Sequence, residues 1–143
     1  MMGNGRGGKF TRLLEKGEEM DTRTQDLLDR TFEFGVRILK MLAAFPSNDS
    51  FRVVTFQLAK SSTSIGANYE EAQAAESKDD FIHKVGISLK EIRESHYWLR
   101  VLRALTTAAE KQNALDHFIA EAEEFKKIFS SIRISASKNK RRN

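Results

Sequence analysis

The chain has 143 residues, of which 40% are hydrophobic, and this suits a single domain with its own core. It contains no cysteine, which excludes disulfide bridges, thiolate metal sites and a cysteine nucleophile. No stretch reaches the roughly 20 apolar residues of a membrane helix, so a cytoplasmic protein without a membrane partner is expected. Lysine and arginine number 24 against 20 acidic residues, and residues 133–143 hold five cations and no acid. The positive excess therefore lies in the C-terminal tail.

The two ends of the chain are expected to lack structure. Residues 1–23 contain five of the eight glycines and little apolar periodicity. Such a segment cannot bury enough surface to offset the entropy lost on ordering, so a disordered N-terminal extension is predicted. A basic, disordered tail is likewise expected over residues 135–143. The folded domain would then span residues 24–134.

Apolar residues recur at helical spacing in four segments of this domain. Pro46, the only proline, ends the first segment, and the polar run from Ser47 to Ser50 offers N-caps for the second. Capping-box patterns begin at Ser77 and Thr107, ahead of the third and fourth segments. Because the connections are short, the chain is predicted to be an all-α, antiparallel up-down-up-down four-helix bundle. The helices are expected over residues 24–45, 50–75, 78–105 and 108–134.

More apolar surface is present than one bundle face needs. The apolar side chains of the first helix spread over roughly 220° of its circumference, which is too wide for a single partner face. Val53, Phe56 and Trp98 also lie away from the main apolar stripes of their helices. A subunit interface would cover these arcs, so a homo-oligomer is predicted. The alternative is a thick bundle that buries wide arcs by itself.

No catalytic or metal-binding pattern is found in the sequence. Di-iron bundles need Glu-x-x-His pairs, and none of His83, His96 and His117 has a glutamate three positions earlier. The glycines near the N-terminus neither follow a strand nor lead into a lysine-serine helix start, so they form no phosphate loop. The chain is therefore predicted not to be an enzyme and to need no cofactor or metal.

A polar group lies near the joint between the second and third helices. Antiparallel pairing there brings positions whose numbers sum to about 153 opposite one another, so Asn68 would lie near Val85. Ser61 and Ser62, on the apolar stripe of the second helix, permit close helix approach. A buried hydrogen-bonded network with a structural role is predicted, with acid–base work by its carboxylates as the alternative. The predicted network comprises Ser64, Asn68, Glu71, Lys84, Glu91 and Glu94.

Cations on the third helix and in the tail are candidate contacts for nucleic acid. Cations along a helix face can follow phosphates, and the rings of Tyr97 and Trp98 lie among the arginines of the third helix. Internal ion pairs are the alternative use of these arginines. The candidate set is Arg93, Arg100, Arg103, Lys138, Lys140, Arg141 and Arg142.

Three stretches resemble a known family: SIGANYEEA (64–72), SKDDFIHK (77–84) and LKEIRESHYWL (89–99). They are similar to the large-subunit ribosomal RNA intervening-sequence protein family, with weaker similarity from about residue 26 to 133. This resemblance implies a small helical bundle. An accessory protein of diversity-generating retroelements resembles the same family and forms a five-fold barrel, which implies a ring-like homo-oligomer, with a pentamer favoured. The family-like polar positions are Ser64, Asn68, Glu71, Asp80, Lys84, Glu91 and Glu94.

The tail and the resemblance together predict a function. The chain is expected to be a non-enzymatic, oligomeric bundle that binds RNA or DNA through its cationic surface. The alternative is a protein-interaction scaffold, for example one that docks a polymerase, without direct contact to nucleic acid.

Overall fold

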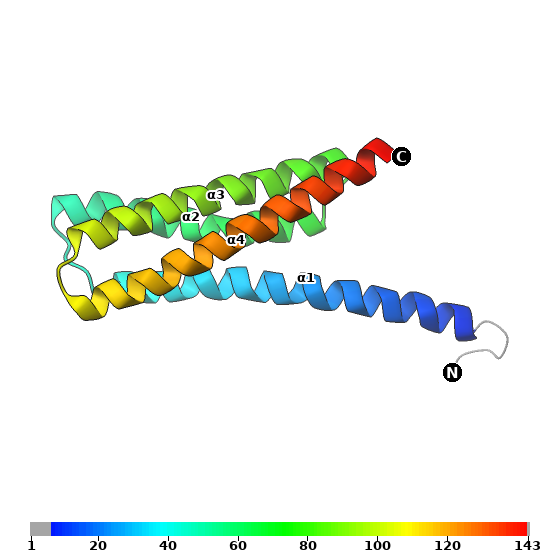
Figure 1. Cartoon of the computed structure of the whole chain (residues 1–143), viewed down its shortest axis with the longest axis horizontal. Coiled ribbons are helices and arrows are strands. Elements are labelled where there is room, and N and C mark those ends of the chain that lie inside the picture. Colours follow the sequence, from blue (N-terminus) through cyan, green and yellow to red (C-terminus); the bar gives the residue numbers. More distant parts are fainter. Residues whose placement is uncertain (1–6, 143) are drawn as a thin grey trace.

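The computed structural model describes residues 7–142 of the chain, with side chains from residue 22 to 141. Its helices are α1 (Gly7–Leu42), α2 (Asp49–Gln73), α3 (Lys78–Leu105) and α4 (Ala109–Arg142). Each runs antiparallel to the one before it (Figure 1). No strand occurs within residues 7–142, which confirms the prediction of an all-α chain of four helices. None of the described helices combines the length and apolar character that crossing a membrane requires.

Side-chain caps set the starts of the middle helices. The Asn48 side chain accepts a hydrogen bond from the backbone N–H of Phe51 at 3.1 Å, which begins α2. Ser77 Oγ accepts from the N–H of Asp80 at 3.0 Å, while Asp80 Oδ2 accepts from the N–H of Glu76 at 3.2 Å. These bonds satisfy donors that the first helical turn leaves unpaired, so both helices begin close to the residues predicted from the caps.

The first helix is longer than the sequence suggested. It begins at Gly7 rather than at residue 24, so the disorder expected over residues 1–23 is wrong for residues 7–23, while residues 1–6 lie outside the described part. The glycine count misled the prediction, because four of those five glycines lie between residues 3 and 8. Beyond them the segment has no proline and is rich in lysine, arginine, glutamate and leucine, which extend an existing helix at little cost.

The last helix also exceeds its expected range. α4 continues to Arg142 instead of ending at residue 134, so the disordered tail predicted for residues 135–143 is corrected to helix, with Asn143 outside the described part. No glycine or proline interrupts this segment. In addition, the Lys140 ammonium forms an ion pair with Asp79 at the start of α3. The tail is thus tied to the body of the bundle.

Backbones of α1 and α2 approach each other closely where two glycines meet the opposite helix. A Cβ atom on Gly66 would lie 3.2 Å from Thr31 Oγ1 and 3.3 Å from the Thr31 carbonyl carbon. On the other side of the crossing, a Cβ atom on Gly35 would lie 3.3 Å from the carbonyl oxygen of Ser62. There is no room for a larger residue without moving a helix.

Buried serines join α2 to α3. Ser95 Oγ donates to Ser61 Oγ at 2.9 Å, and Ser88 Oγ donates to the backbone carbonyl of Ile65 at 3.0 Å. All three serine side chains are excluded from solvent. These pairs follow the antiparallel register and the close approach at Ser61 that the sequence predicted. Each hydroxyl is satisfied, so the contact adds direction to an apolar seam without leaving an unpaired polar group.

Aromatic rings connect α1 to α4 in the interior. Phe34 of α1 makes edge-to-face contacts with Phe118 and Phe125, whose ring centroids lie 5.9 and 5.3 Å away. Tyr69 of α2 meets Phe129 at 5.1 Å in the same geometry. Such pairs stabilise the fold beyond the apolar area that they bury. Away from this cluster, α1 and α4 separate toward the C-terminal end of α4 (Figure 1).

Candidate nucleic-acid interface

Two of the predicted nucleic-acid contacts are held in ion pairs within the bundle. The Arg103 guanidinium binds Asp116 of α4, with Nη2 3.1 Å from Oδ2. This hydrogen bond lowers the pKa of the Asp116 carboxyl. Lys140 pairs with Asp79, as described above. For Arg103, the internal ion pair that the sequence left open as an alternative is the one observed, whereas the pairing of Lys140 was not anticipated.

The remaining candidates fall into two separate groups. Arg93 and Arg100 are exposed on α3, and Lys138 and Arg141 are exposed on α4. None of these four forms an ion pair with any described residue, and the side chain of Arg142 lies outside the described part. Arg100 is 21 residues from Asp79, the partner of the tail, which corresponds to roughly 30 Å along a helix. The predicted set is therefore not one continuous patch.

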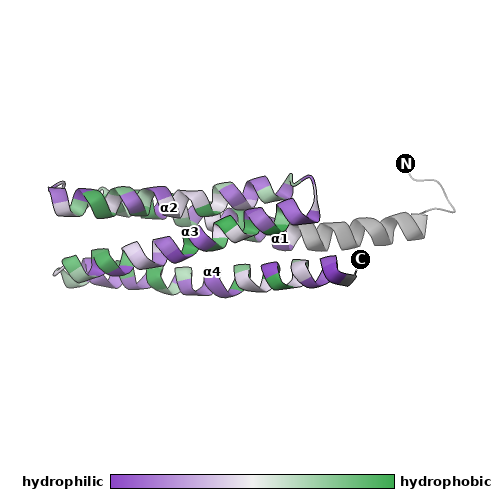
Figure 2. Ribbon diagram, turned by 90° about the horizontal axis from the view of Figure 1, so that it is seen from above, coloured by the Kyte–Doolittle hydropathy of each residue, from purple (hydrophilic) through white to green (hydrophobic). Residues whose placement is uncertain are grey.

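The C-terminal half of α4 carries more positive charge than the sequence reasoning recognised. After Glu124 the helix contains no acidic residue, whereas five of the six acidic or basic residues before that point are acids. Figure 2 shows the last turn of α4 as strongly hydrophilic. The signal that was missed is the abrupt change of charge sign within one helix. We call the following residues the basic half of α4: Lys126, Lys127, Arg133, Lys138, Lys140, Arg141 and Arg142.

Members of the basic half differ in their freedom to bind a ligand. Lys126 lies 3.2 Å from Glu123, and the Arg133 guanidinium packs beside Gly86 of α3. By contrast, Lys127, Lys138 and Arg141 are exposed, and their spacing of 11 and 14 residues places them on one face of the helix. Together they form a cationic stripe about 21 Å long on the outside of α4.

The polar network predicted between α2 and α3 is not formed. Ser64 Oγ donates to the carbonyl of Lys60 at 2.7 Å, and the Asn68 amide donates to the carbonyl of Ser64 at 2.8 Å, so both bond to their own helix. Lys84 pairs with Asp80 one turn away at 2.9 Å. Glu71 is exposed, and Glu94 lies 4.0 Å from Lys90. For Ser64 and Asn68, a backbone carbonyl one turn away competes with any partner on another helix.

One carboxyl of that predicted group has an altered environment. Partial burial raises the pKa of Glu91, and the nearby charge of Glu94 raises it further. No hydrogen bond links Glu91 to a described histidine, serine or lysine that would act with it as an acid–base pair. Its geometry therefore supports no specific reaction.

A half-buried histidine lies on the seam between α3 and α4. His96 Nε2 is 2.6 Å from Glu123 Oε1, and only 14% of the His96 side chain is exposed. The pKa of His96 is lowered, mainly because burial disfavours its charged form, and Lys126 and Arg100 act in the same direction. Glu123 opposes this shift without overcoming it. Neutral His96, with Nε2 close to the Glu123 carboxylate, is thus the form that the folded chain favours at neutral pH.

This histidine makes stability depend on pH. The unfolded chain has a histidine of ordinary pKa near 6.5, so below that pH it binds a proton that folded His96 accepts less readily. We expect the melting temperature to fall between about pH 7.5 and 5.5, and the His96→Gln variant to show a smaller fall. Thermal unfolding followed by circular dichroism measures both. The exposed His83→Gln variant is the matched control, and an equal loss of pH dependence there would contradict the assignment.

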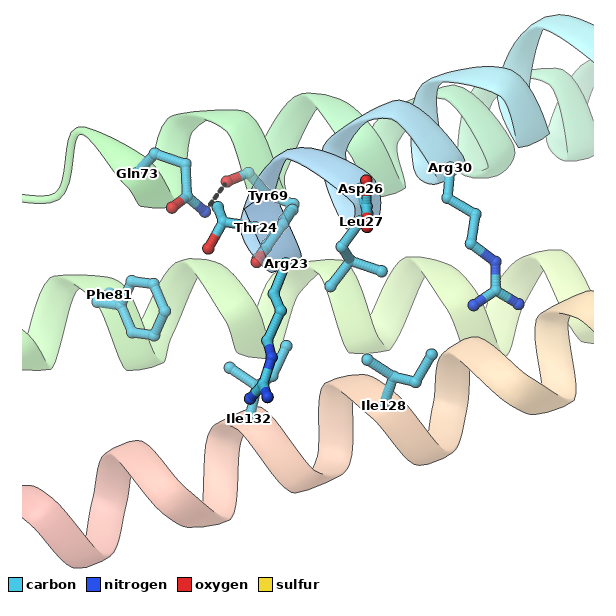
Figure 3. Close-up of a pocket in the computed structure, with 10 residues that line it drawn as sticks. All are labelled: Arg23, Thr24, Asp26, Leu27, Arg30, Tyr69, Gln73, Phe81, Ile128 and Ile132. Carbon is cyan, nitrogen blue, oxygen red and sulfur yellow. Dashed lines mark hydrogen bonds between the residues drawn. The ribbon is translucent and has the colours of Figure 1, made fainter. Parts of the chain in front are cut away.

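A cavity of about 430 Å³ opens where α1 and α4 separate (Figure 3). Its wall includes Arg30, which is held 2.7 Å from Glu121 and 2.8 Å from Glu124 of α4. Burial raises the pKa of the Tyr69 hydroxyl at its edge. The lining combines apolar side chains with groups already bonded to the protein, and it shows no nucleophile paired with a base. Its residues are Arg23, Thr24, Asp26, Leu27, Arg30, Tyr69, Gln73, Phe81, Ile128 and Ile132.

Metal ligands are not grouped in the described part of the chain. No cluster of three or more histidine, aspartate or glutamate residues there is arranged to hold an ion. The arrangement of charge on α3 and α4 is therefore the feature of this molecule that points most directly to a ligand.

Comparison with known proteins identifies the family. The 23S rRNA-intervening sequence protein family matches residues 23–131, which is most of the chain and includes part or all of each of the four helices. The chain belongs to this family. It is also similar to the crystal structure of a protein with unknown function from the S23 ribosomal protein family from Bacteroides thetaiotaomicron, at 34% identity and a TM-score of 0.65. That match covers 74% of this chain and 96% of the other. No curated protein matches the chain.

Proposed function

We propose that this member of the 23S rRNA-intervening sequence protein family is a non-enzymatic, cytoplasmic homo-oligomer that binds RNA or DNA. The observation that carries the proposal is the segregation of charge along α4, whose basic half contains seven cations and no acid. The family description refers to an intervening sequence of 23S rRNA, which favours RNA as the ligand. A relationship to the retroelement accessory protein, and the five-fold ring that it implies, belong to the same proposal.

Binding through phosphates accounts for the form of this surface. Lys127, Lys138 and Arg141 are separate point charges on a rigid helix, and no described acid pairs with them. Such cations neutralise successive backbone phosphates and release condensed counterions, so they give affinity without reading sequence. The helix dipole adds partial negative charge at this end, which the cations also offset. The surface is therefore suited to a nucleic-acid backbone rather than to a particular base sequence.

The triple variant Lys127→Gln, Lys138→Gln, Arg141→Gln tests this stripe. In a filter or gel assay, the full chain should bind RNA at about 50 mM salt. The logarithm of the binding constant should fall linearly with the logarithm of the salt concentration. Because three phosphate contacts are lost, the slope of that line should become less steep by about two to three in the variant. Deleting residues 138–142 should shift it in the same direction.

A matched triple variant separates local from general charge effects. Lys40→Gln, Arg52→Gln and Lys60→Gln remove the same net charge from exposed sites on α1 and α2. This control should bind nearly as well as the unaltered chain, with a similar salt slope. Equal losses in both triple variants, or no binding by the unaltered chain at low salt, would overturn the proposed role of α4.

Self-association rests on a different surface. A groove of about 350 Å³ runs between α1 and α2, and its lining includes Leu28, Phe32, Val36, Leu39, Thr63 and Ala67. Phe32 is 65% exposed there, and Phe56, on the outward face of α2, is 64% exposed. One chain thus carries both an apolar hollow and projecting apolar side chains. A second copy of the chain supplies what each lacks, and contacts between two different patches form a ring when the rotation between subunits closes.

Removing this apolar surface should release single chains. Light scattering of the unaltered protein is expected to give a multiple of 16.3 kDa, and the multiple measures the subunit count. Phe32→Asp combined with Leu39→Asp should shift the mass to that of one chain, because charges in a dry interface are costly. Ile134→Asp, at an exposed position on α4, should leave the mass unchanged. A single-chain mass for the unaltered protein would contradict this part of the proposal.

The alternative is a scaffold that docks a partner protein, such as a polymerase, and does not touch nucleic acid itself. The observation in its favour is that large apolar side chains, among them Val53 and Phe56, remain exposed on α2. The two functions differ in the salt experiment. A scaffold would show no affinity for nucleic acid at low salt, whatever the state of α4.

A further inference from the structure

Another hollow lies between α2 and α3, and no residue of α4 is among those that line it. It has a volume of about 500 Å³ and is lined by Gln57, Lys90, Arg93, Glu94, Tyr97 and Trp98. We call it the aromatic hollow. Rings and cations meet in it within two turns of one helix, so its chemistry differs from that of the apolar groove between α1 and α2.

The rings of the aromatic hollow are held in place but not fully covered. Tyr97 and Trp98 meet edge to face, with centroids 5.0 Å apart and an angle of 79° between their planes. Trp98 packs against the hydrophobic core, which anchors the pair. Tyr97 nevertheless remains 53% exposed, and an edge-to-face contact occupies at most one face of its ring. A flat partner can stack on the rest of that ring without any rearrangement.

Charged and polar side chains beside the Tyr97 ring restrict which ligands the aromatic hollow can bind. Arg93 precedes Tyr97 by four residues, so its guanidinium projects from the same face of α3 about one turn away. Arg93 is exposed and forms no ion pair with any described residue, while Lys90 has only Glu94 at 4.0 Å. The Gln57 amide, on the α2 side, offers both donors and an acceptor. A ligand that fits all three features is planar, carries hydrogen-bonding edges and has a negative charge about one helical turn from its ring.

An unpaired nucleotide has these properties, and a base within a duplex does not expose its face. We infer that the aromatic hollow takes one unpaired base of a single-stranded RNA or DNA, with the base stacked on Tyr97 and its phosphate on Arg93. This inference rests on the proposed function and narrows it, because the stripe on α4 alone would not distinguish single strands from duplexes. Stacking is tolerant of sequence, since every base has a flat face.

Trp98 makes the site directly observable, because it is the only tryptophan in the chain. The experiment adds 12-nucleotide oligouridylate, 12-nucleotide oligodeoxythymidylate and a duplex of equal length to the full chain at low salt. Each single strand should quench the emission of Trp98, and the duplex should not. Tyr97→Ala should weaken single-strand binding about 5- to 100-fold, the loss expected for one stacked base, whereas Tyr97→Phe should retain it.

The contact between Arg93 and a phosphate can be tested separately. Arg93→Gln should weaken single-strand binding and make the salt slope less steep by about one, because one phosphate contact is lost. Arg52→Gln, which removes an exposed cation at the start of α2, is the matched control and should change neither. A uniform loss in both variants would overturn the contact between Arg93 and phosphate.

The remaining outcomes separate this inference from the proposed function. Salt-dependent binding that persists without quenching of Trp98, or that is unchanged in Tyr97→Ala, would overturn the aromatic hollow and leave the stripe on α4 standing. Equal affinity for the duplex and the single strands would also overturn the aromatic hollow and leave the stripe on α4 standing. If Tyr97→Ala instead lowers the oligomeric mass and iodide cannot reach Trp98 in the unaltered chain, the hollow is a subunit interface and the inference is wrong. If the chain binds no nucleic acid, both the inference about the aromatic hollow and the proposed function are wrong.

Discussion

Replacing Phe125 with alanine should destabilise the fold by about 3 to 5 kcal/mol, the usual loss when a buried phenylalanine is truncated in a core. The ring is fully buried and contacts Phe34 of α1 at 5.3 Å and Phe129 at 6.5 Å. The Arg30 guanidinium lies over it at 5.0 Å. Urea unfolding monitored by circular dichroism measures the loss, at one protein concentration because self-association also contributes to stability.

The position of Phe125 explains why a large effect is expected. Its neighbours Phe34 and Phe129 are themselves held by contacts with Phe118 and Tyr69, so they cannot readily fill the space that the ring leaves. The cavity should therefore collapse poorly, which places the loss in the upper part of the usual range. Ile134→Ala on the same helix is the control, because its side chain is 56% exposed and should change stability by less than about 0.5 kcal/mol. A loss below about 1 kcal/mol for Phe125→Ala would show that the joint between α1 and α4 is not closed as described.

The parts of this structure that depend on neighbouring residues could be predicted from the sequence. Apolar periodicity gave the helices, and local capping residues such as Asn48 and Ser77 gave their starts. The contact of Ser88 with Ile65 follows from the register that a short connection imposes. Both depend on geometry within a few turns, for which the sequence holds the needed information.

The ends of the bundle could not be predicted in the same way. Disorder was expected for residues 7–23 from composition, yet a helix already formed at residue 24 extends at low cost through residues without strong breakers. The C-terminal tail gains its ion pair between Lys140 and Asp79 only because α3 starts beside the end of α4. That contact spans 61 residues of sequence, and no local pattern announces it.

Predictions about the polar residues failed for a related reason. Position along the two helices does not decide which partner a side chain chooses. Asn68 and Ser64 had a carbonyl of their own helix within reach, and that local bond competes with any bond across the seam. Arg103 was assigned to nucleic acid from its charge, and its partner Asp116 lies on a helix that only the folded chain brings near.

Replacing Gly66 with leucine should destabilise the fold by about 1 to 3 kcal/mol or more, because the crossing of α1 and α2 has no space for a side chain. A Cβ atom there would already be 3.3 Å from the Thr31 carbonyl carbon and 3.4 Å from the Phe32 nitrogen. These are backbone atoms of a long helix, so they cannot swing aside as the end of a flexible side chain does. Relief requires α1 to move outward, which would also loosen the contacts of Phe34 with α4.

Gly86→Ala provides the matched control for this argument. The nearest group to a Cβ atom on Gly86 would be the Arg133 guanidinium at 3.5 Å, an ordinary contact with the end of a flexible side chain. Removing glycine from a helix interior should then stabilise the fold by about 0.5 to 1 kcal/mol. Gly66→Ala gains the same helical preference but must force two backbones apart, so it should be less stable than Gly86→Ala in parallel urea unfolding. Equal stability of the two alanine variants would mean that α1 and α2 are not in close contact at Gly66, and the groove beside them would lose its wall.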